Sequence, residues 1–260
     1  MALLPRTIAR LEIKCFLYVP FNAVHAPLQV PKKYSNLYPQ LRGNRQTYAG
    51  MVTAMDEAIG RIVAALQEAK MLEQALIIFS SDNGGPNPKQ LTSNGELRAG
   101  KGTVYEGGVR VCAFATWPGQ IPAADIETPI HITDWYPTLL RLAGAKTEQF
   151  GTVDGQDIWP VLKDHVSSMR DVFVLNSAPD ESAIRVGKWK LVVHTGRDAA
   201  AELYDLEKDA GEKVDLAGKH PDKVRELQMR LVKFAEEAIP PRGGPQPAGF
   251  KAPQVWGEAA

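Results

Sequence analysis

A long helical pattern that leads directly into a short apolar run is the feature that most restricts how this chain can fold. Apolar residues recur every three or four positions across Asn44–Met71, so they share one face of a helix. Ala75–Ser80 (ALIIFS) follows and is almost entirely apolar, which is typical of a strand buried on both faces of a parallel sheet. A helix followed by such a strand predicts an α/β fold.

Further elements are predicted on both sides of this unit. Strands are expected at Cys15–Val19 and Val109–Thr116, and a helix at Thr133–Ala143, with Thr133 as its N-cap and Gly144 as its C-cap. Later in the chain the pattern changes to short strands followed by one helix. These elements are Val172–Leu175, Ala183–Val186, Trp189–His194, Glu202–Tyr204 and the helix Pro221–Ala238. Strands with one covering helix predict a small α+β unit.

The charge balance excludes several classes of partner. The 260 residues include 30 Lys+Arg and 30 Asp+Glu, so the net charge is zero and no broad surface for nucleic acid or anionic lipid is expected. The longest apolar runs are far shorter than the roughly 20 residues that span a bilayer. Cys15 and Cys112 form neither a disulfide framework nor a closely spaced pair of metal ligands.

Polar residues follow the predicted strand 75–80 at its carboxyl end, where open α/β sheets bind ligands. Asp82 and Asn83 offer a carboxylate and an amide oxygen, which are the atoms that hard cations such as Ca²⁺ or Mg²⁺ prefer. The alternative is an ordinary turn, because Asp, Asn and Gly all tolerate turn geometry.

His25 and Lys101 are two further candidates. His25 follows the first predicted strand and could exchange a proton with a substrate, although a single loop histidine is more often solvated and inert. Lys101 lies between Gly100 and Gly102, which let the backbone approach a ligand and leave the ammonium open to an anionic substrate. A surface loop without chemistry is the alternative, and the P-loop pattern is absent.

Several longer motifs follow one another in a characteristic order. They are Asn22–Pro27 (NAVHAP), Ser81–Gly85 (SDNGG), Gly100–Val111 (GKGTVYEGGVRV), His131–Leu140 (HITDWYPTLL), Asp154–Asp157 (DGQD), Gly187–Leu191 (GKWKL) and Glu202–Leu206 (ELYDL). In this order they resemble the later part of the arylsulfatase family, and they look most similar to its arylsulfatase B-like members. The resemblance covers roughly Cys15 to Ile239.

This resemblance implies a fold and a division of the chain. The fold is α/β: part of the alkaline-phosphatase-like sulfatase sandwich, with a mostly parallel sheet flanked by helices, plus a small C-terminal α+β subdomain with an antiparallel sheet. Residues 15–168 would form the partial catalytic domain and residues 169–239 the subdomain. Residues 1–14 would be an unrelated leader, and residues 240–260 a Pro/Gly-rich tail.

The resemblance also implies the chemistry. Members of the family hydrolyse aryl or carbohydrate sulfate esters with a divalent cation, usually Ca²⁺. Asp82 and Asn83 match the pair that ligates this cation. His25 matches the histidine that contacts the sulfate ester and helps the departing oxygen, and Lys101 matches the lysine that neutralises sulfate oxygens. A cation, a lysine and a histidine oppose the negative charge that develops during sulfate ester cleavage.

Some residues of the family pattern have no counterpart. The family nucleophile is a formylglycine made from Cys or Ser in a Cys/Ser-x-Pro/Ala-x-Arg motif, which occurs at neither Cys15 nor Cys112 and at no serine. The early aspartate pair of the family is also missing. We therefore expect the chain to be inactive alone and to lack an N-terminal half that would act as its partner. Family members are commonly secreted, periplasmic or lysosomal, but no signal peptide is visible.

Two other functions stay open. One is a phosphate or phosphonate ester hydrolase of the same superfamily, which would use similar metals. The other is a non-catalytic fragment that binds a metal or a sulfated glycan.

Overall fold

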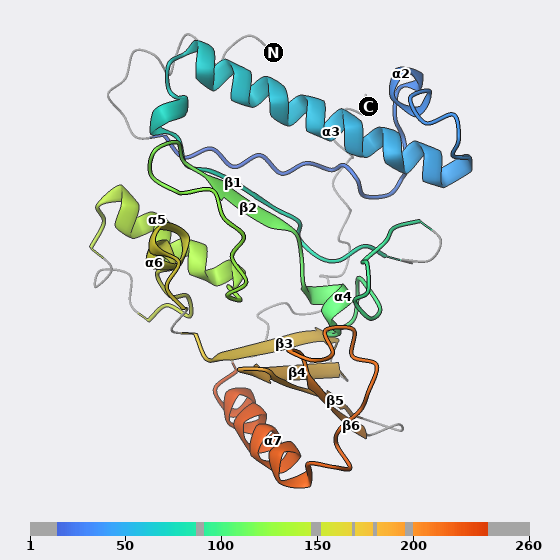
Figure 1. Ribbon diagram of the computed structural model, residues 1–260, viewed down its shortest axis with the longest axis vertical. Coiled ribbons are helices and arrows are strands. Elements are labelled where there is room, and N and C mark those ends of the chain that lie inside the picture. Colours follow the sequence, from blue (N-terminus) through green and yellow to red (C-terminus); the bar gives the residue numbers. More distant parts are fainter. Residues whose placement is uncertain are drawn as a thin grey trace, which may run out of the picture.

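The computed structural model describes residues 15–86, 91–146, 152–167, 170–178, 181–195 and 200–238. These residues form two regions that lie one above the other in Figure 1. The first region contains a long helix, a two-stranded sheet and several short helices, and the second is a four-stranded sheet covered by one helix. The predicted boundaries of the leader, the two domains and the tail stay a prediction.

The long helix is confirmed as α3, Gly43–Glu68. The short helix α2, Lys32–Ser35, packs against it where α3 has Gly50, and a Cβ atom at Gly50 would lie 3.0 Å from the backbone nitrogen of Ser35. Only Gly50 and Met51 of α3 are buried, and Val52 is 38% exposed. Much of the predicted apolar face is therefore only half covered.

The strand that follows is β1, Ile77–Ser80, after the 3₁₀ helix η1, Leu72–Gln74. It pairs antiparallel with β2, Ala113–Thr116, and the Phe79 and Phe114 rings stack with their centroids 4.9 Å apart. A parallel, fully buried strand was predicted, but β1 is half-buried and its described partner runs in the opposite direction. An apolar run indicates burial, and it does not specify the direction of the neighbouring strand.

The prediction of a buried strand at Cys15–Val19 is wrong. Residues 15–20 have no strand pairing with any described segment, and Phe16 and Tyr18 are 76% and 75% exposed. The apolar composition was correctly recognised, but a strand forms only where a second backbone accepts and donates its hydrogen bonds. The predicted strand Val109–Thr116 is also shorter than expected, because the helix α4, Glu106–Val109, precedes β2.

The helix predicted at Thr133–Ala143 is present as the 3₁₀ turn η2, Ile132–Asp134, and the helix α5, Trp135–Ala143. Gly144 ends α5 in the left-handed conformation, as predicted, with φ of 82°. The N-cap is His131 and not Thr133: the His131 ring accepts from the Thr133 backbone N–H, and the Asp134 carboxylate accepts from the His131 N–H. The helix α6, Trp159–Asp164, follows.

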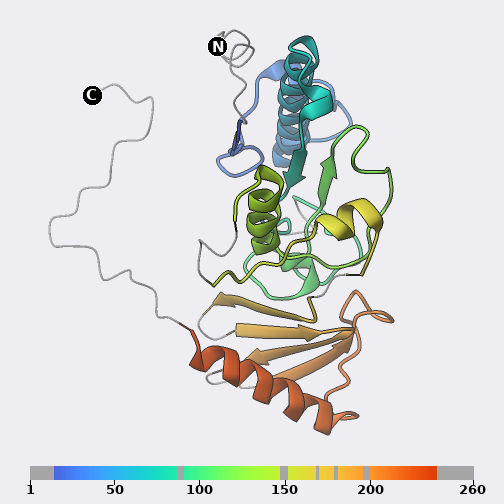
Figure 2. The ribbon, with the colours of Figure 1, turned by 90° about the vertical axis from the view of Figure 1, so that its left-hand side faces the viewer.

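The second region confirms the predicted α+β unit. Its strands β3 (Val172–Ala178), β4 (Glu181–Val186), β5 (Trp189–His194) and β6 (Ala200–Asp205) are antiparallel and lie in chain order. The helix α7, Pro221–Glu236, covers one face of the sheet (Figure 2). Between them lies a core of fully buried residues, namely Ile184, Leu191, Leu203 and Leu227. The opposite face packs against Val104 and Tyr105 of the first region.

Among the described helices, none combines the length and the apolar composition needed to cross a bilayer.

Candidate active site

The loop that follows β1, residues 81–85, carries the first pair of candidates and is called the Asp82 loop below. Asp82 is exposed and Asn83 is half-buried. The Ser81 hydroxyl donates to the Asn83 carbonyl (2.9 Å), and the Asn83 amide nitrogen donates to the Gly84 carbonyl (3.0 Å). Because the amide nitrogen is engaged, the amide oxygen of Asn83 is the atom that a cation would meet.

Lys101 lies in a second loop, residues 98–106, which is called the Lys101 loop below. Its ammonium is exposed, and its backbone N–H donates to the Gly85 carbonyl (3.4 Å). Asn94, just before this loop, accepts from the Gly85 N–H (2.9 Å) and donates to the Gly85 and Ala99 carbonyls (3.0 and 2.8 Å). One side chain therefore joins the Asp82 loop to the Lys101 loop.

Close backbone contacts of the Asp82 loop with the Lys101 loop and with α4 explain the glycines of these segments. The Gly84 N–H donates to the Gly108 carbonyl (2.9 Å), and a Cβ atom at Gly84 would lie only 1.8 Å from the Gly107 oxygen. A Cβ atom at Gly100 would lie 2.2 Å from the Gly85 oxygen. The sequence suggested that Gly100 lets the backbone approach a ligand, but it is the other loop that approaches.

His25 is exposed and lies apart from these contacts. Its backbone N–H donates to the Asn22 carbonyl (2.8 Å), and its Nδ1 lies 2.8 Å from the Ala26 carbonyl oxygen. Within the described residues, no hydrogen bond or ion pair joins His25 to the Asp82 loop or the Lys101 loop. The structure thus brings three of the four candidates to neighbouring loops and leaves the position of His25 relative to them as a prediction.

A buried charge cluster that the sequence did not reveal lies directly behind the Lys101 loop. The Lys190 ammonium of β5 lies 2.8 Å from a carboxylate oxygen of Glu106 and 2.8 Å from one of Glu212, and its side chain is 0% exposed. The Glu106 backbone N–H donates to the other Glu212 oxygen (2.7 Å). Burial raises the pKa of Glu212, and the Lys190 charge opposes this shift without cancelling it.

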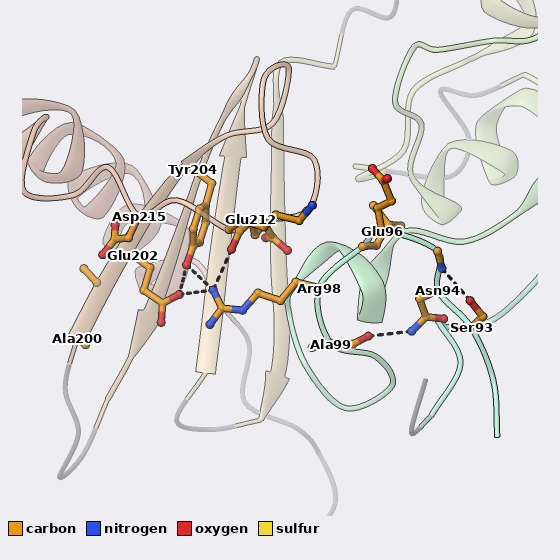
Figure 3. Close-up of a pocket in the computed structure, with 15 residues that line it drawn as sticks. Ser93, Asn94, Glu96, Arg98, Ala99, Ala200, Glu202, Tyr204, Glu212 and Asp215 are labelled. Carbon is orange, nitrogen blue, oxygen red and sulfur yellow. Dashed lines mark hydrogen bonds and ion pairs between the residues drawn. The ribbon is translucent and has the colours of Figure 1, made fainter. Parts of the chain in front are cut away.

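A second cation holds the beginning of the Lys101 loop. Arg98 donates to the Glu202 carboxylate (3.0 Å), to the Tyr204 hydroxyl, to the Glu212 carbonyl (3.3 Å) and to the Tyr105 hydroxyl (3.2 Å). Its guanidinium carbon lies 3.9 Å from the centroid of the Tyr105 ring. Figure 3 shows the bonds from Arg98 to Glu202, Tyr204 and Glu212. These residues line a cleft of about 970 Å³ between residues 93–99 and the β6 side.

The pKa shifts around Arg98 follow from burial and from these hydrogen bonds. Burial alone would raise the pKa of Glu202, but the hydroxyls of Tyr204 and Tyr105 and the Arg98 charge outweigh it and lower the pKa. Burial and the neighbouring Glu202 carboxylate raise the pKa of Tyr105 to about 12. Glu202 is therefore charged at neutral pH, and Tyr105 keeps its proton.

The donor atoms of the Asp82 loop do not complete a cation site. Asp82 and Asn83 supply at most a few oxygen ligands, whereas Ca²⁺ takes about six to eight. In the described ranges no three residues among His, Cys, Asp and Glu form a group that could hold a metal ion. The sequence also lacks the Cys/Ser-x-Pro/Ala-x-Arg motif from which a formylglycine would be made.

Comparisons with known proteins identify the class to which this fold and these loops belong. The sequence profile of the family described as Sulfatase matches residues 2–145, and the profile described as N-sulphoglucosamine sulphohydrolase, C-terminal, matches residues 98–238. The chain belongs to the sulfatase family.

Particular relatives make the similarity concrete. The chain is 33% identical to arylsulfatase J of Mus musculus and 32% identical to arylsulfatase A of Homo sapiens, covering 93% and 92% of this chain but 49% and 52% of those proteins. The crystal structure of Ps i-CgsB in complex with k-i-k-neocarrahexaose aligns with a TM-score of 0.84 and 31% identity, over 90% of this chain and 53% of that one. The chain spans about half the length of the curated relatives it matches.

The similarity confirms the predicted resemblance and the alkaline-phosphatase-like fold class. The described strand pairs are all antiparallel, so the parallel part of the predicted sheet is not represented among them.

Proposed function

We propose that this chain provides the sulfate-facing and cation-facing loops of a sulfuric ester hydrolase that acts on aryl or carbohydrate sulfate esters. The observation that carries the proposal is the contact between the Asp82 loop and the Lys101 loop, made by the Lys101–Gly85 backbone hydrogen bond and supported by the Gly84–Gly108 bond to the adjoining α4. An exposed carboxylate and an exposed ammonium thereby lie on adjoining loops. The relatives named as arylsulfatases support the substrate class.

The proposed roles follow from the charge that develops in the reaction. Cleavage of a sulfate ester places negative charge on the sulfuryl oxygens and on the departing oxygen, and fixed positive charge stabilises that transition state. Lys101 would bind the sulfuryl oxygens. His25 would give a proton to the departing oxygen. Asp82 and Asn83 would contribute oxygen ligands to a Ca²⁺ or Mg²⁺ ion whose remaining ligands come from outside the described residues.

We also propose that the chain by itself does not turn over a sulfate ester. Its sequence has no formylglycine motif, and loss of a covalent nucleophile costs an enzyme many powers of ten in kcat. A segment corresponding to the part of the relatives' sequences that this chain does not match would supply the nucleophile and the other cation ligands. The DNA upstream of Met1 tests whether a preceding segment supplies the nucleophile. An open frame that encodes the motif supports that part of the proposal, and an intergenic stretch with its own promoter contradicts it.

The cation-binding role can be tested on the chain itself. Calorimetric titration with Ca²⁺ should show binding that is weak, because few ligands are present, and that disappears in Asp82→Ala. The exposed Asp125 is a matched control, and Asp125→Ala should bind Ca²⁺ like the unchanged chain. Equal binding by both variants would contradict the assignment of Asp82.

The substrate class needs a second measurement. Hydrolysis of nitrophenyl sulfate and nitrophenyl phosphate should be compared, for the chain and for any longer protein that its reading frame encodes. A dominant phosphate rate would replace the proposal with a phosphate ester hydrolase. Ca²⁺ or sulfated-glycan binding without turnover in the longer protein would instead favour a non-catalytic module.

A further inference from the structure

Lys190 lies at a place where a sheet normally has an apolar residue. Its strand faces the first region through Lys190, Val192 and His194, and Val192 belongs to the core between the two regions. The Lys190 ammonium is fully buried between Glu106 and Glu212, at 2.8 Å from each carboxylate. Two carboxylates around one ammonium leave a formal charge of minus one in this core, so packing alone does not account for the choice of residues.

The Glu106 carboxylate connects this cluster to the Lys101 loop. Glu106 ends that loop and begins α4, and its own backbone N–H also donates to Glu212 (2.7 Å). Both its side chain and its backbone are therefore held by groups of the C-terminal region. Glu212 itself has a positive φ of 51°, an unusual conformation for a residue other than glycine, and it is 1% exposed.

The other end of the loop is held separately. Arg98 reaches the C-terminal sheet through the bonds to Glu202 and Tyr204 shown in Figure 3. Lys101 lies between these two attachments, and its ammonium is exposed. A loop fixed at one end can still swing, whereas a loop fixed at both ends presents its side chains from a defined backbone.

We propose that Lys190 is a positioning residue: its buried ammonium, through Glu106, fixes the loop that presents Lys101 beside the Asp82 loop. This inference rests on the proposed sulfate-binding role of Lys101. A fixed cation stabilises developing charge better than a mobile one, because it needs no rearrangement during the reaction. A buried ion pair often gives little net stability compared with apolar residues of similar volume, so geometric definition is the property that it adds here.

The proposal is tested by the spread of positions that the Lys101 loop adopts. Nitroxide labels are attached to Lys101→Cys and to Met229→Cys, which is exposed on α7, after the exposed Cys15 and Cys112 are replaced by serine. Pulsed electron paramagnetic resonance then gives the distribution of distances between the labels in the full-length chain. We expect a narrow distribution that broadens about twofold in Lys190→Met, because the loop end is released locally.

Two matched variants separate positioning from general stability. Lys188→Met removes a partly exposed lysine of the same hairpin, paired with Asp205 at 3.0 Å, and should leave the distribution narrow. Lys190→Arg keeps a cation and should restore a width close to that of the background. Circular dichroism confirms that each variant is folded, and a purely structural role would lower stability without broadening the distribution of the folded protein.

If Lys190→Met does not fold, Glu106→Gln decides the question, because it keeps the Lys190–Glu212 pair and weakens only the link to the loop. An unchanged distribution in folded Lys190→Met, or in Glu106→Gln where Lys190→Met is unfolded, would overturn the proposal. Equal broadening by Lys188→Met would also overturn it. The measurement involves no substrate, so its failure leaves the proposed sulfatase chemistry untouched, and absent turnover leaves this proposal untouched.

Discussion

The two regions of the molecule differ in how completely each buries its own apolar residues. In the C-terminal region, Leu191, Leu203 and Leu227 are 0% exposed between the sheet and α7. In the first region, Phe114 of β2 is 56% exposed, and the extended segment before α2 exposes Phe16 to 76%. Figure 2 shows the two sheets: the four-stranded sheet lies on α7, whereas β1 and β2 form a separate two-stranded sheet.

The comparison shows where stability and chemistry reside in this chain. A two-stranded sheet is marginally stable by itself, whereas four strands covered by a helix form an independent core. The proposed site residues all belong to the first region, and the Lys101 loop is attached to the C-terminal region through Arg98 and Lys190. The C-terminal region is thus the support on which the Lys101 loop is built.

The largest expected effect is therefore in the C-terminal core. Leu227→Ala removes a fully buried side chain and should lower the free energy of unfolding of this region by about 2–5 kcal/mol. Phe114→Ala is the matched change in the first region and should cost only about 0.5–1.5 kcal/mol, since the ring loses mainly its stacking on Phe79. Hydrogen exchange of the β5 and β1 amides at increasing urea concentrations measures the unfolding free energy of each region in the two variants.

Equal costs for these two variants would contradict the difference between the regions. A larger cost for Phe114→Ala would mean that the exposed face of β2 is covered in the protein in solution.

A smaller effect is expected where the Asp82 loop meets α4, directly after the Lys101 loop. Gly84→Ala places a Cβ atom 1.8 Å from the Gly107 oxygen, so the two segments must separate, at a cost of about 1–3 kcal/mol. Gly60→Ala is a control in α3, where a new Cβ meets nothing within 4 Å, and it should stabilise the helix by about 0.5–1 kcal/mol. Urea unfolding should show a lower free energy of unfolding for Gly84→Ala and a higher one for Gly60→Ala. Faster hydrogen exchange in residues 100–108 should occur only in Gly84→Ala.

The sequence predicts elements well where periodicity is strong. The helix at residues 43–68 and the hairpin strands at 181–186 and 189–194 lie close to their predicted positions, because alternation and helical spacing report directly on which faces are buried. The strand prediction at Cys15–Val19 was wrong because composition alone was used. Its composition indicates burial, but only a neighbouring backbone can make it a strand.

The candidate site was predictable only in part. Asp82 and Lys101 stand out in the sequence because glycines lie close to each of them, and in the structure their loops adjoin. Lys190 could not be found in this way, since a lysine in an amphipathic strand is expected on the solvent face. Its burial depends on Glu106 and Glu212, which are 84 and 22 positions away in the chain, so that only the folded structure reveals the cluster.

The smallest effect concerns two carboxylates of the C-terminal region whose pKa values shift in opposite directions. The pKa of Glu202 is lowered, so its contribution to stability is present above its ordinary pKa of 4.5 and is lost as the pH falls through the folded value. The pKa of Glu212 is raised by burial, so stability is instead lost as the pH rises from 4.5 through the folded value.

Substitution by glutamine separates the two contributions, because glutamine does not titrate. In Glu202→Gln, the free energy of unfolding of the C-terminal region should fall less as the pH is lowered below 4.5. In Glu212→Gln, it should fall less as the pH is raised above 4.5. Urea midpoints between about pH 3 and pH 8, the range that spans ordinary carboxyl titration, measure this. If both variants flattened the same side, the pKa of Glu212 would be lowered like that of Glu202, and the Lys190 charge would outweigh the effect of burial on Glu212.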